Sequence, residues 1–251
     1  MIVLLLFFVI NNNFIIKNID DGQITLLFNN FPFIALSFSI LGLMFTINGF
    51  NFIDGNNGLL LGTTIIILFN FLIYSGNNNH EVDLLISSLL LVVIILFVFN
   101  FFSGSILTGD TGSYFLGFLI GTIAILLKNY GLINSYLIAC IISYPIFELI
   151  TSFFRRLLIN KKNPFSPDSL HLHSMLFTIL RGRFENILSI NMINSFTSLV
   201  IICYQAFISL GIFYYSYIIG YFYSFFILLF LYLCFYLILY NKLKNSFLSY
   251  N

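Results

Sequence analysis

Long apolar segments follow one another along the whole chain, and they constrain its fold more than any other feature. Eight such segments, separated by short polar stretches, occur within 251 residues. A helix needs about 20 apolar residues to cross a hydrocarbon core of about 30 Å, and only helices and closed barrels satisfy their backbone groups in lipid. Runs such as 89–99 do not alternate apolar and polar residues, as barrel strands would. The sequence therefore predicts an all-α, polytopic transmembrane helical bundle of about eight spans.

Composition supports this class. Hydrophobic residues make up 60% of the chain and charged residues 8%, against about 25% charged residues in soluble domains. A net charge of +1 leaves no footprint for nucleic acid, and the three cysteines are isolated, with no spacing typical of a zinc site or a disulfide framework. The predicted spans are approximately 1–16, 33–47, 59–74, 84–102, 114–127, 132–154, 188–216 and 218–240. They form one integral-membrane domain over 1–251.

Alternate crossings by these spans place three polar segments on one membrane face. We call 48–58 the first polar segment, 103–113 the second and 155–187 the third. Basic residues gather on the same face, which the positive-inside rule makes cytoplasmic: Arg155, Arg156, Lys161, Lys162, Arg181, Arg183, Lys242 and Lys244. Three segments far apart in sequence can therefore build one cytoplasmic site, with the third as its catalytic loop.

The first polar segment carries Asn48, Asn51 and Asp54 at intervals of three residues. This spacing puts their side chains on one face of a helix end. Gly55 and Gly58 allow the backbone to turn close to a ligand. An ordinary helix C-terminus would also explain the glycines, although it would not require Asp54.

The second polar segment contains Asp110 between Gly109 and Gly112, directly before an apolar run. Thr111 or Ser113 is expected to cap the following helix, whose free backbone N–H groups favour phosphate. An aspartate beside such a turn can hold Mg²⁺, which prefers carboxylate and phosphate oxygens. The alternative is a common Asp-containing turn with a capping hydroxyl.

The third polar segment is the longest, and its two prolines predict an extended loop. Residues two apart face the same way in extended chain, so His171 and His173 can act together. Mg²⁺ does not favour imidazole, and these histidines are interpreted as phosphate or sugar contacts. Asp168, Arg155 and Arg156 are further candidates for substrate contacts. Juxtamembrane arginines are also expected from topology alone.

Glu148 is an intramembrane ionisable group near the cytoplasmic end of its span. Such groups are costly in lipid and usually serve a function. Glu148 is therefore expected to support the site.

Segments 48–59, 109–117 and 164–173, in this order, closely resemble the polyprenyl-phosphate N-acetylhexosamine-1-phosphate transferases. This is the glycosyltransferase family 4 group that contains the peptidoglycan phospho-MurNAc-pentapeptide transferase and the GlcNAc-1-phosphate transferases. By this resemblance Asp110 corresponds to the family's magnesium aspartate, and Asn51 and Asp54 to its conserved asparagine and aspartate. His171 and His173 correspond to its histidine motif.

The resemblance implies a multi-pass enzyme of the bacterial inner (plasma) membrane. Such an enzyme uses Mg²⁺, with Mn²⁺ as an alternative, to transfer a sugar 1-phosphate from a UDP-sugar to polyprenyl (undecaprenyl) phosphate. UMP is released, and the step initiates the synthesis of a cell-envelope polysaccharide such as cell wall, lipopolysaccharide or O-antigen. Asp54 and Asp110 would hold the metal, and Asn48, Asn51, Asn57 and Thr111 would join the substrate contacts. A homodimer is left open.

Three departures from the family pattern stand out. Asn57 and Ser174 replace an aspartate and a histidine of many relatives, and the family's cytoplasmic Asp-Asp pair is missing. Asp20 and Asp21 fall across the membrane and cannot replace it. The sequence is therefore expected to lack the family's first spans. The alternative is a degenerate, non-catalytic member that binds the lipid carrier or a partner. A transporter is disfavoured, because the polar groups gather at one face.

Overall fold

The computed structural model describes residues 2–11, 14–76, 78–104, 108–159 and 170–248. All regular elements in these ranges are helical, which confirms the all-α prediction. They are α1 (Ile2–Asn11), α2 (Gly22–Asn30), α3 (Pro32–Ile53), α4 (Leu59–Ser75), α5 (His80–Ser103), α6 (Gly109–Asn129), α7 (Ser135–Ile141), α8 (Ser143–Phe154), the π-helical turn η1 (Arg155–Ile159), α9 (Leu172–Phe184), α10 (Ile190–Ile219) and α11 (Tyr221–Leu248).

Five of the described helices are long and apolar enough to cross a membrane: α3, α5, α6, α10 and α11. Helices α7 and α8 form a broken sixth candidate, bent by 73°, and α4 is a shorter apolar helix of 17 residues. The helix predicted at 1–16 ends earlier than expected, because α1 ends at Asn11 and residues 14–20 are not helical. Its 10 residues cover about 15 Å. Apolar composition did not reveal where this helix ends.

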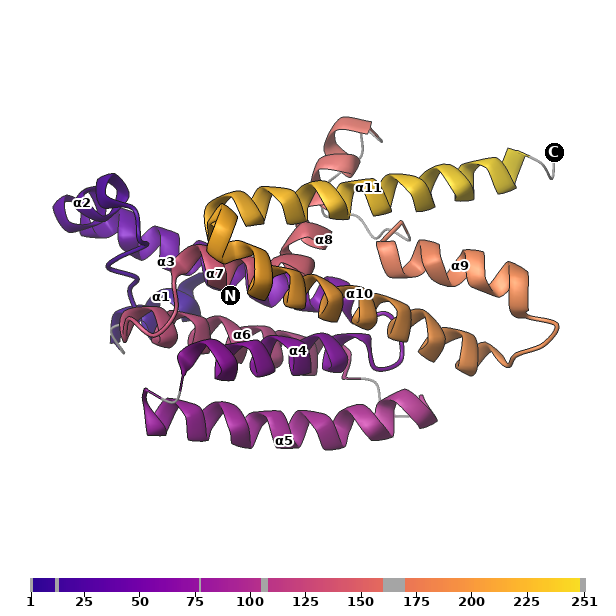
Figure 1. Cartoon of the computed structure of the whole chain (residues 1–251), viewed down its shortest axis with the longest axis horizontal. Helices are drawn as coiled ribbons and strands as arrows, with labels where there is room; N and C mark the ends of the chain where they lie inside the picture. Colours follow the sequence, from indigo (N-terminus) through magenta and orange to yellow (C-terminus); the bar gives the residue numbers. More distant parts are fainter. Residues whose placement is uncertain (1, 12–13, 77, 105–107, 160–169, 249–251) are drawn as a thin grey trace.

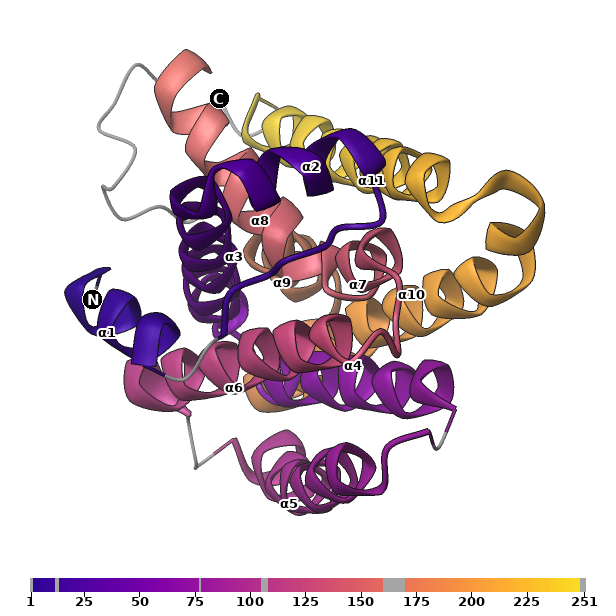
Figure 2. The same cartoon turned by 90° about the vertical axis from the view of Figure 1, so that its left-hand side faces the viewer.

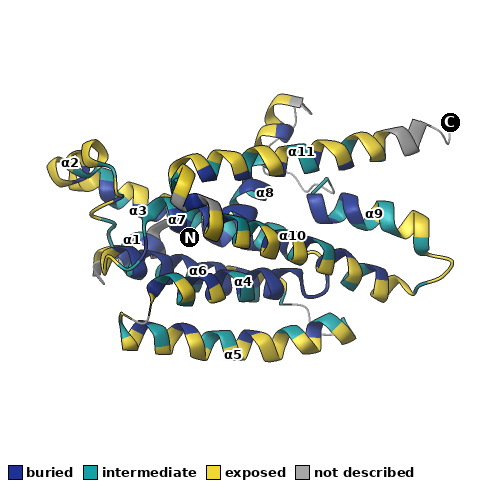
Figure 3. Ribbon diagram, in the orientation of Figure 1, coloured by how far each residue is buried: buried dark blue, intermediate teal, exposed yellow. Residues whose placement is uncertain are grey.

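The long helices lie side by side along the longest axis of the molecule. In Figure 1, α2 lies at one end of this bundle and α9 at the other. The view turned by 90° places α5 at the edge of the bundle (Figure 2). Much of the α5 surface is exposed (Figure 3), including Leu84, Leu91 and Phe99. An apolar exposed face of this kind suits contact with lipid chains.

Helix α3 packs closely against both α6 and α8. A Cβ atom added at Gly117 of α6 would lie 2.7 Å from the Cα atom of Ile47 in α3. One added at Gly49 of α3 would lie 2.8 Å from the carbonyl oxygen of Pro145 in α8. Small residues allow such close approach between membrane helices. The end of α3 is thereby fixed against the start of α6 and against α8.

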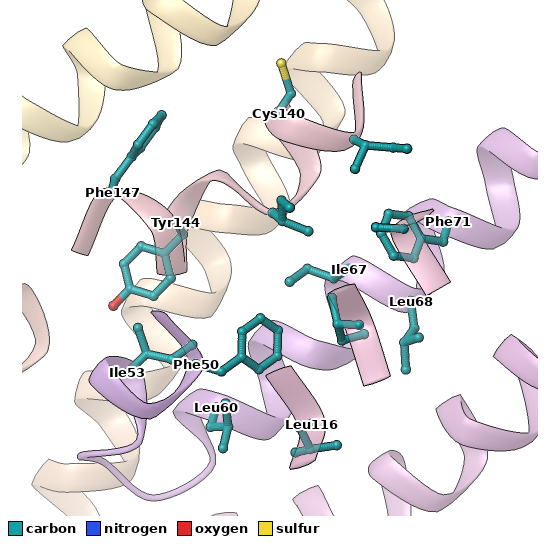
Figure 4. Close-up of a cluster of buried hydrophobic side chains, with 14 of the residues drawn as sticks. Phe50, Ile53, Leu60, Ile67, Leu68, Phe71, Leu116, Cys140, Tyr144 and Phe147 are labelled. Atoms are coloured by element: carbon teal, nitrogen blue, oxygen red, sulfur yellow. The ribbon is translucent and has the colours of Figure 1, made fainter. Parts of the chain in front are cut away.

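Large buried side chains fill the space around these contacts (Figure 4). Phe50 and Ile53 of α3 are fully buried there, and Phe147 of α8 is 1% exposed. Burying one such side chain is worth about 1.5–3 kcal/mol. The last turns of α3, which form the start of the first polar segment, are therefore anchored in the main core.

Helices α4 and α10 are joined by hydrogen bonds inside the bundle. Gln205 donates through Nε2 to Thr63 Oγ1 at 3.0 Å, and Ser209 donates through Oγ to Asn70 Oδ1 at 2.7 Å. Each such bond between membrane helices contributes about 0.6 kcal/mol. They hold α4 in place, although neither lies in a polar segment.

The connection between α3 and α4, the end of α5 and the start of α6 lie at the same end of the bundle as α9 (Figure 1). This arrangement brings the described parts of the three polar segments together, as the span count predicted. Asp20 lies at the other end, where it pairs with Lys128 at 2.6 Å. That the shared face is cytoplasmic stays a prediction.

Candidate active site

Two aspartates, one after α3 and one in α6, lie at the shared end. Asp54 is the first residue beyond α3, and Asp110 lies in the first turn of α6. Asn51 donates through Nδ2 to Asp110 Oδ1 at 3.0 Å and to Ser113 Oγ at 3.1 Å. In the opposite direction, Thr108 donates through Oγ1 to Asp54 Oδ1 at 2.7 Å. Each aspartate is thus held by a residue that adjoins the other.

The electrostatic environment of Asp54 disfavours its charge. Burial is the largest effect and raises the pKa of Asp54 above its usual value. The hydrogen bond from Thr108 lowers the pKa, the charge of Asp110 raises it, and a hydrogen bond from the Gly109 backbone lowers it. The net shift is upward. Within the described part of the chain, neither aspartate forms an ion pair. The pair therefore concentrates negative charge without a cationic partner among these residues.

The start of α6 differs from the prediction. The helix begins at Gly109, so Thr111 and Ser113 lie inside it and cannot serve as its N-cap. Thr108 occupies the N-cap position without capping the helix, because its hydroxyl bonds to Asp54 instead. Thr111 is exposed on the first turn, where the backbone N–H groups of a helix favour anions.

The predicted column of oxygen atoms in the first polar segment is shorter than expected. Asn48 donates through Nδ2 to the carbonyl oxygen of Met44, one turn back in its own helix, at 2.7 Å. Of the three side chains in this column, Asn51 and Asp54 form hydrogen bonds with described residues of the second segment. Asn57 is buried, and its backbone N–H donates to Asn194 Oδ1 at 2.9 Å.

Sequence reasoning missed two asparagines that hold the turn after Asp54. Asn194 of α10 accepts from Asn57, and Asn100 of α5 accepts through Oδ1 from the backbone N–H of Gly58. Gly58 has a φ of +76°, which favours glycine. Asn100 stands out in the sequence as a single polar residue inside an apolar run. The sequence does not reveal that its partner is the backbone of Gly58.

The predicted extended loop around the two prolines lies mostly outside the described residues. Where the structure describes it again, His171 has an extended backbone and α9 begins at Leu172, so His173 is helical and not extended as predicted. The imidazole rings of His171 and His173 nevertheless stack, with centroids 5.6 Å apart and planes 5° apart. His171 also meets the ring of Phe52 edge-on at 5.1 Å. The two histidines do lie together, although not for the predicted reason.

The two histidines differ in exposure. The side chain of His171 is 12% exposed, and His173 is 4% exposed. His173 packs against the turn after Asp54, since a Cβ atom at Gly55 would lie 2.2 Å from its Nε2 atom. Burial lowers the pKa of His173 to about 4, the charge of Glu148 opposes this shift and the charge of His171 adds to it. His173 is therefore neutral near pH 7, and His171 is better placed to meet a phosphate.

Arg155 and Arg156 lie in η1, next to the same end of α3, and both are 5% exposed. Arg155 donates through Nη2 to the carbonyl oxygen of Leu170 at 3.3 Å. The Arg156 guanidinium carbon lies 5.4 Å from the centroid of the Phe52 ring. Both arginines thus bring positive charge toward the histidines. Asp168 lies outside the described residues.

Fold and site together define an integral membrane protein with a polar site at one end of a helical bundle. The site combines two carboxylates, a helix N-terminus and buried arginines, which suits a metal cation and an anionic ligand. The chain belongs to glycosyl transferase family 4, whose sequence profile matches residues 1–128. This range contains Asn51, Asp54 and Asp110, and the match confirms the family to which the sequence was compared.

Two curated relatives are similar to part of the chain. One is the "Probable undecaprenyl-phosphate N-acetylglucosaminyl 1-phosphate transferase" of Bacillus subtilis, 31% identical over 57% of this chain and 40% of that protein. The other is the "Undecaprenyl-phosphate alpha-N-acetylglucosaminyl 1-phosphate transferase" of Thermotoga maritima, 30% identical over 57% of this chain and 43% of that protein. The chain thus matches about two fifths of the length of either relative. No solved structure matches it.

Proposed function

We propose that the protein transfers N-acetylhexosamine 1-phosphate from a UDP-sugar to undecaprenyl phosphate and releases UMP. The observation that carries this proposal is the pair of aspartates at the N-terminus of α6. Asn51 donates a hydrogen bond to Asp110, and Thr108 donates one to Asp54. The names of both relatives support undecaprenyl phosphate as the acceptor and N-acetylglucosamine 1-phosphate as the transferred group. The enzyme would work in the bacterial plasma membrane, with the shared end facing the cytoplasm.

Asp54 and Asp110 fit a magnesium ion. The hydrogen bonds to both carboxylates come from neutral donors, and a carboxylate has further lone pairs that can serve as ligands. Mg²⁺ is usually held by one or two carboxylates together with substrate phosphates, so the pair is sufficient without a third protein ligand. Mn²⁺ has similar preferences. The bound cation would neutralise charge on the pyrophosphate of the UDP-sugar.

Transfer joins an oxygen of the lipid phosphate to the β-phosphorus and breaks the bond from that phosphorus to the bridging oxygen, which leaves with UMP. Such reactions depend mainly on positioning and electrostatic stabilisation. In this proposal Asn51 holds Asp110, and Thr108 holds Asp54. The first N–H groups of α6 face the developing phosphate charge. His171 contacts phosphate or sugar, and Arg156 places positive charge beside it.

The test is an Asp110→Asn variant, which keeps the size of the side chain and removes its charge. The chain is reconstituted in lipid vesicles with undecaprenyl phosphate and UDP-N-acetylglucosamine, and UMP release is measured with Mg²⁺. We expect a loss of at least about 100-fold, since a catalytic metal stabilises the transition state by several kcal/mol.

The matched control is Asp21→Asn at the opposite end of the bundle. Asp21 caps α2 by accepting from the backbone N–H of Ile24 at 3.0 Å, and asparagine caps helices equally well. This variant should retain the wild-type rate. Undiminished UMP release by Asp110→Asn would remove the proposed role of that residue.

A second candidate function is non-catalytic binding of the lipid carrier. It is favoured by the position of Asp20 and Asp21, which lie away from the shared end and supply no second acidic pair there. This function predicts that the wild-type vesicles bind undecaprenyl phosphate and release no UMP. It also predicts that Asp110→Asn leaves the binding unchanged.

A further inference from the structure

Glu148 is a fully buried carboxylate in the middle of α8, with 0% exposure. Its Oε1 atom accepts a hydrogen bond from the backbone N–H of Leu172 at 3.0 Å. Its Oε2 atom lies 3.4 Å from His171 Nδ1. Leu172 is the first residue of α9 and His171 is its N-cap. One carboxylate in the bundle therefore contacts both the start of α9 and the imidazole beside it.

These contacts account for a charged group in an apolar helix. A buried carboxylate is costly unless donors satisfy it, and the first N–H groups of a helix lack partners within the helix. His171 does not cap α9 with its own side chain. Glu148 supplies the missing acceptor from another helix, where a negative charge also complements the helix dipole.

The neighbouring residue is held as well. The carbonyl oxygen of Leu170 accepts from the hydroxyl of Tyr236 in α11 at 2.9 Å and from Arg155 Nη2 at 3.3 Å. The backbone on both sides of His171 is therefore fixed by α8, η1 and α11. With the backbone fixed, Glu148 can still determine the orientation of the His171 imidazole and the ring nitrogen that carries its proton.

A carboxylate accepts hydrogen bonds and does not donate them, so a bond between Glu148 and His171 requires a proton on Nδ1. The Nε2 atom of His171 has no hydrogen-bond partner among the described residues. Its ring lies against Phe52, which directly follows Asn51 and precedes Asp54 by two positions. Nε2 is thus the nitrogen that remains available to a ligand at the site.

We propose that Glu148 is a positioning residue that fixes His171 in its Nδ1–H form and leaves Nε2 to meet the substrate. The proposal rests on the proposed transferase function and adds the residue that orients the histidine. Ser152 offers the competing arrangement, because its Oγ lies 3.2 Å from the same Nδ1 atom and can donate to it. In that arrangement the proton would lie on Nε2.

The tautomer can be measured directly, since the chain contains only three histidines. Ring ¹⁵N spectra of histidine-labelled chain in lipid nanodiscs, taken at a pH where the ring is neutral, distinguish the two forms. A His171→Asn variant identifies the signals of that residue. We expect protonated Nδ1 in the wild type. Protonated Nε2 in the wild type would overturn the proposal.

The decisive variant is Glu148→Gln. Its amide oxygen can still accept from Leu172, and its NH₂ group then faces Nδ1 and requires a lone pair there. We expect the proton to move to Nε2. The control is Glu185→Gln on the exposed end of α9, where Glu185 pairs with Arg181 at 3.4 Å and is 52% exposed. The control and Ser152→Ala should keep protonated Nδ1. An unchanged tautomer in Glu148→Gln, or a change caused by Ser152→Ala, would overturn the proposal.

Kinetics separate positioning from a purely structural role. We expect Glu148→Gln to lower kcat for UMP release about tenfold, as is typical when the partner of a functional histidine is removed. The KM for the UDP-sugar should change less than twofold, because ground-state binding is retained. A loss that only follows the amount of folded protein, with kcat per folded chain unchanged, would show that Glu148 merely caps α9.

The two proposals can fail separately. If the wild type releases no UMP, the proposed transferase function fails whatever the spectra show. If the wild type is active and Glu148→Gln keeps both its tautomer and its kcat, the transferase function stands and the positioning role fails.

Discussion

The two ends of the bundle place an aspartate in opposite electrostatic environments. At one end, Asp20 accepts from Lys128 Nζ at 2.6 Å and from the backbone N–H of Ser135 at 2.7 Å. Burial by itself would raise the pKa of Asp20, but these bonds and the charge of Lys128 outweigh it, and the pKa is lowered. At the other end, burial raises the pKa of Asp54, and the charge of Asp110 raises it further.

This difference separates a structural contact from a functional one. The Asp20 pair joins the segment before α2 to the end of α6 and is neutral within the protein. The Asp54 pair leaves its charge uncompensated among the described residues, which disfavours folding locally. Groups whose placement destabilises the folded protein are typical of functional sites. A bound cation would remove the repulsion between Asp54 and Asp110. The contrast between the two ends therefore favours the end with Asp54 as the cation site.

The strongest test of the contrast is Asp54→Asn, which should impair activity and improve stability. We expect UMP release to fall at least about 100-fold, because a proposed metal ligand is lost. A raised pKa in the folded state means that the contribution of Asp54 to stability is present at low pH and is lost as pH rises through the folded-state pKa. At pH 7 the charge therefore destabilises the fold, and its removal should raise the unfolding temperature in metal-free buffer.

The same measurement with Mg²⁺ provides the control for this prediction. The cation should raise the unfolding temperature of the wild type and have little effect on Asp54→Asn, since binding to the folded state stabilises it. A less stable Asp54→Asn protein in metal-free buffer would show that the aspartate is a structural group like Asp20.

A second test alters the helix contact that brings the functional end together. Gly117→Ala places a methyl group within 2.7 Å of Ile47 Cα and 2.9 Å of the Thr46 carbonyl oxygen. Since backbone atoms cannot move aside easily, we expect a loss of about 1–3 kcal/mol in the free energy of unfolding. Activity should fall as well, because Asp110 shifts relative to Asp54. Denaturant unfolding in detergent measures the stability.

The matched control for this helix contact is Gly42→Ala in α3, where an added Cβ atom meets nothing within 4 Å. This variant should be as stable as the wild type or slightly more stable, since alanine favours a helix. Equal destabilisation by both changes would mean that α3 and α6 do not depend on their close approach.

The overall arrangement of the functional end could be predicted from sequence because it depends on simple regularities. Apolar runs indicate helices, and alternate crossings assign polar segments to faces. Those two steps were enough to bring Asp54 and Asp110 to the same end. The hydrogen bonds observed there join residues that are 54 to 62 positions apart in the sequence. The position of the three segments at one end depends only on the helices between them, so it does not depend on the extent of the first predicted span.

The local details could not be predicted, because each depends on a distant partner. The Thr108 hydroxyl leaves α6 uncapped only because Asp54 lies within 2.7 Å. The residues after His171 form a helix whose N-terminus is satisfied by Glu148, 24 positions earlier. Prolines before His171 favoured an extended loop, and nothing in the local sequence reveals the buried acceptor that stabilises α9.

A third test addresses the structural end. Asp20→Asn removes the charge that pairs with Lys128, whose side chain is 8% exposed. We expect a loss of about 1 kcal/mol in the free energy of unfolding, because a hydrogen bond to a charged group contributes about 1.5–3 kcal/mol and solvent screening reduces this at an exposed residue. UMP release per folded protein should stay within about twofold of the wild type, because stability and transition-state binding are separate quantities. A loss of activity as large as that of Asp54→Asn would erase the distinction between the two ends.

The smallest effect is expected from Thr108→Val, which removes a neutral donor from Asp54 and keeps the shape of the side chain. The bond stabilises the charged form of Asp54 and lowers its pKa, so its loss, worth about 1 kcal/mol, should raise that pKa further. If transfer requires ionised Asp54, activity falls as pH drops through this pKa, and the acidic limb of the pH–activity profile should move to higher pH in the variant. Thr25→Val at the structural end removes a comparable hydroxyl, bonded to Asn18 Oδ1 at 3.2 Å, and should leave the profile unchanged. An acidic limb that stays in place in Thr108→Val would mean that another group limits activity at low pH.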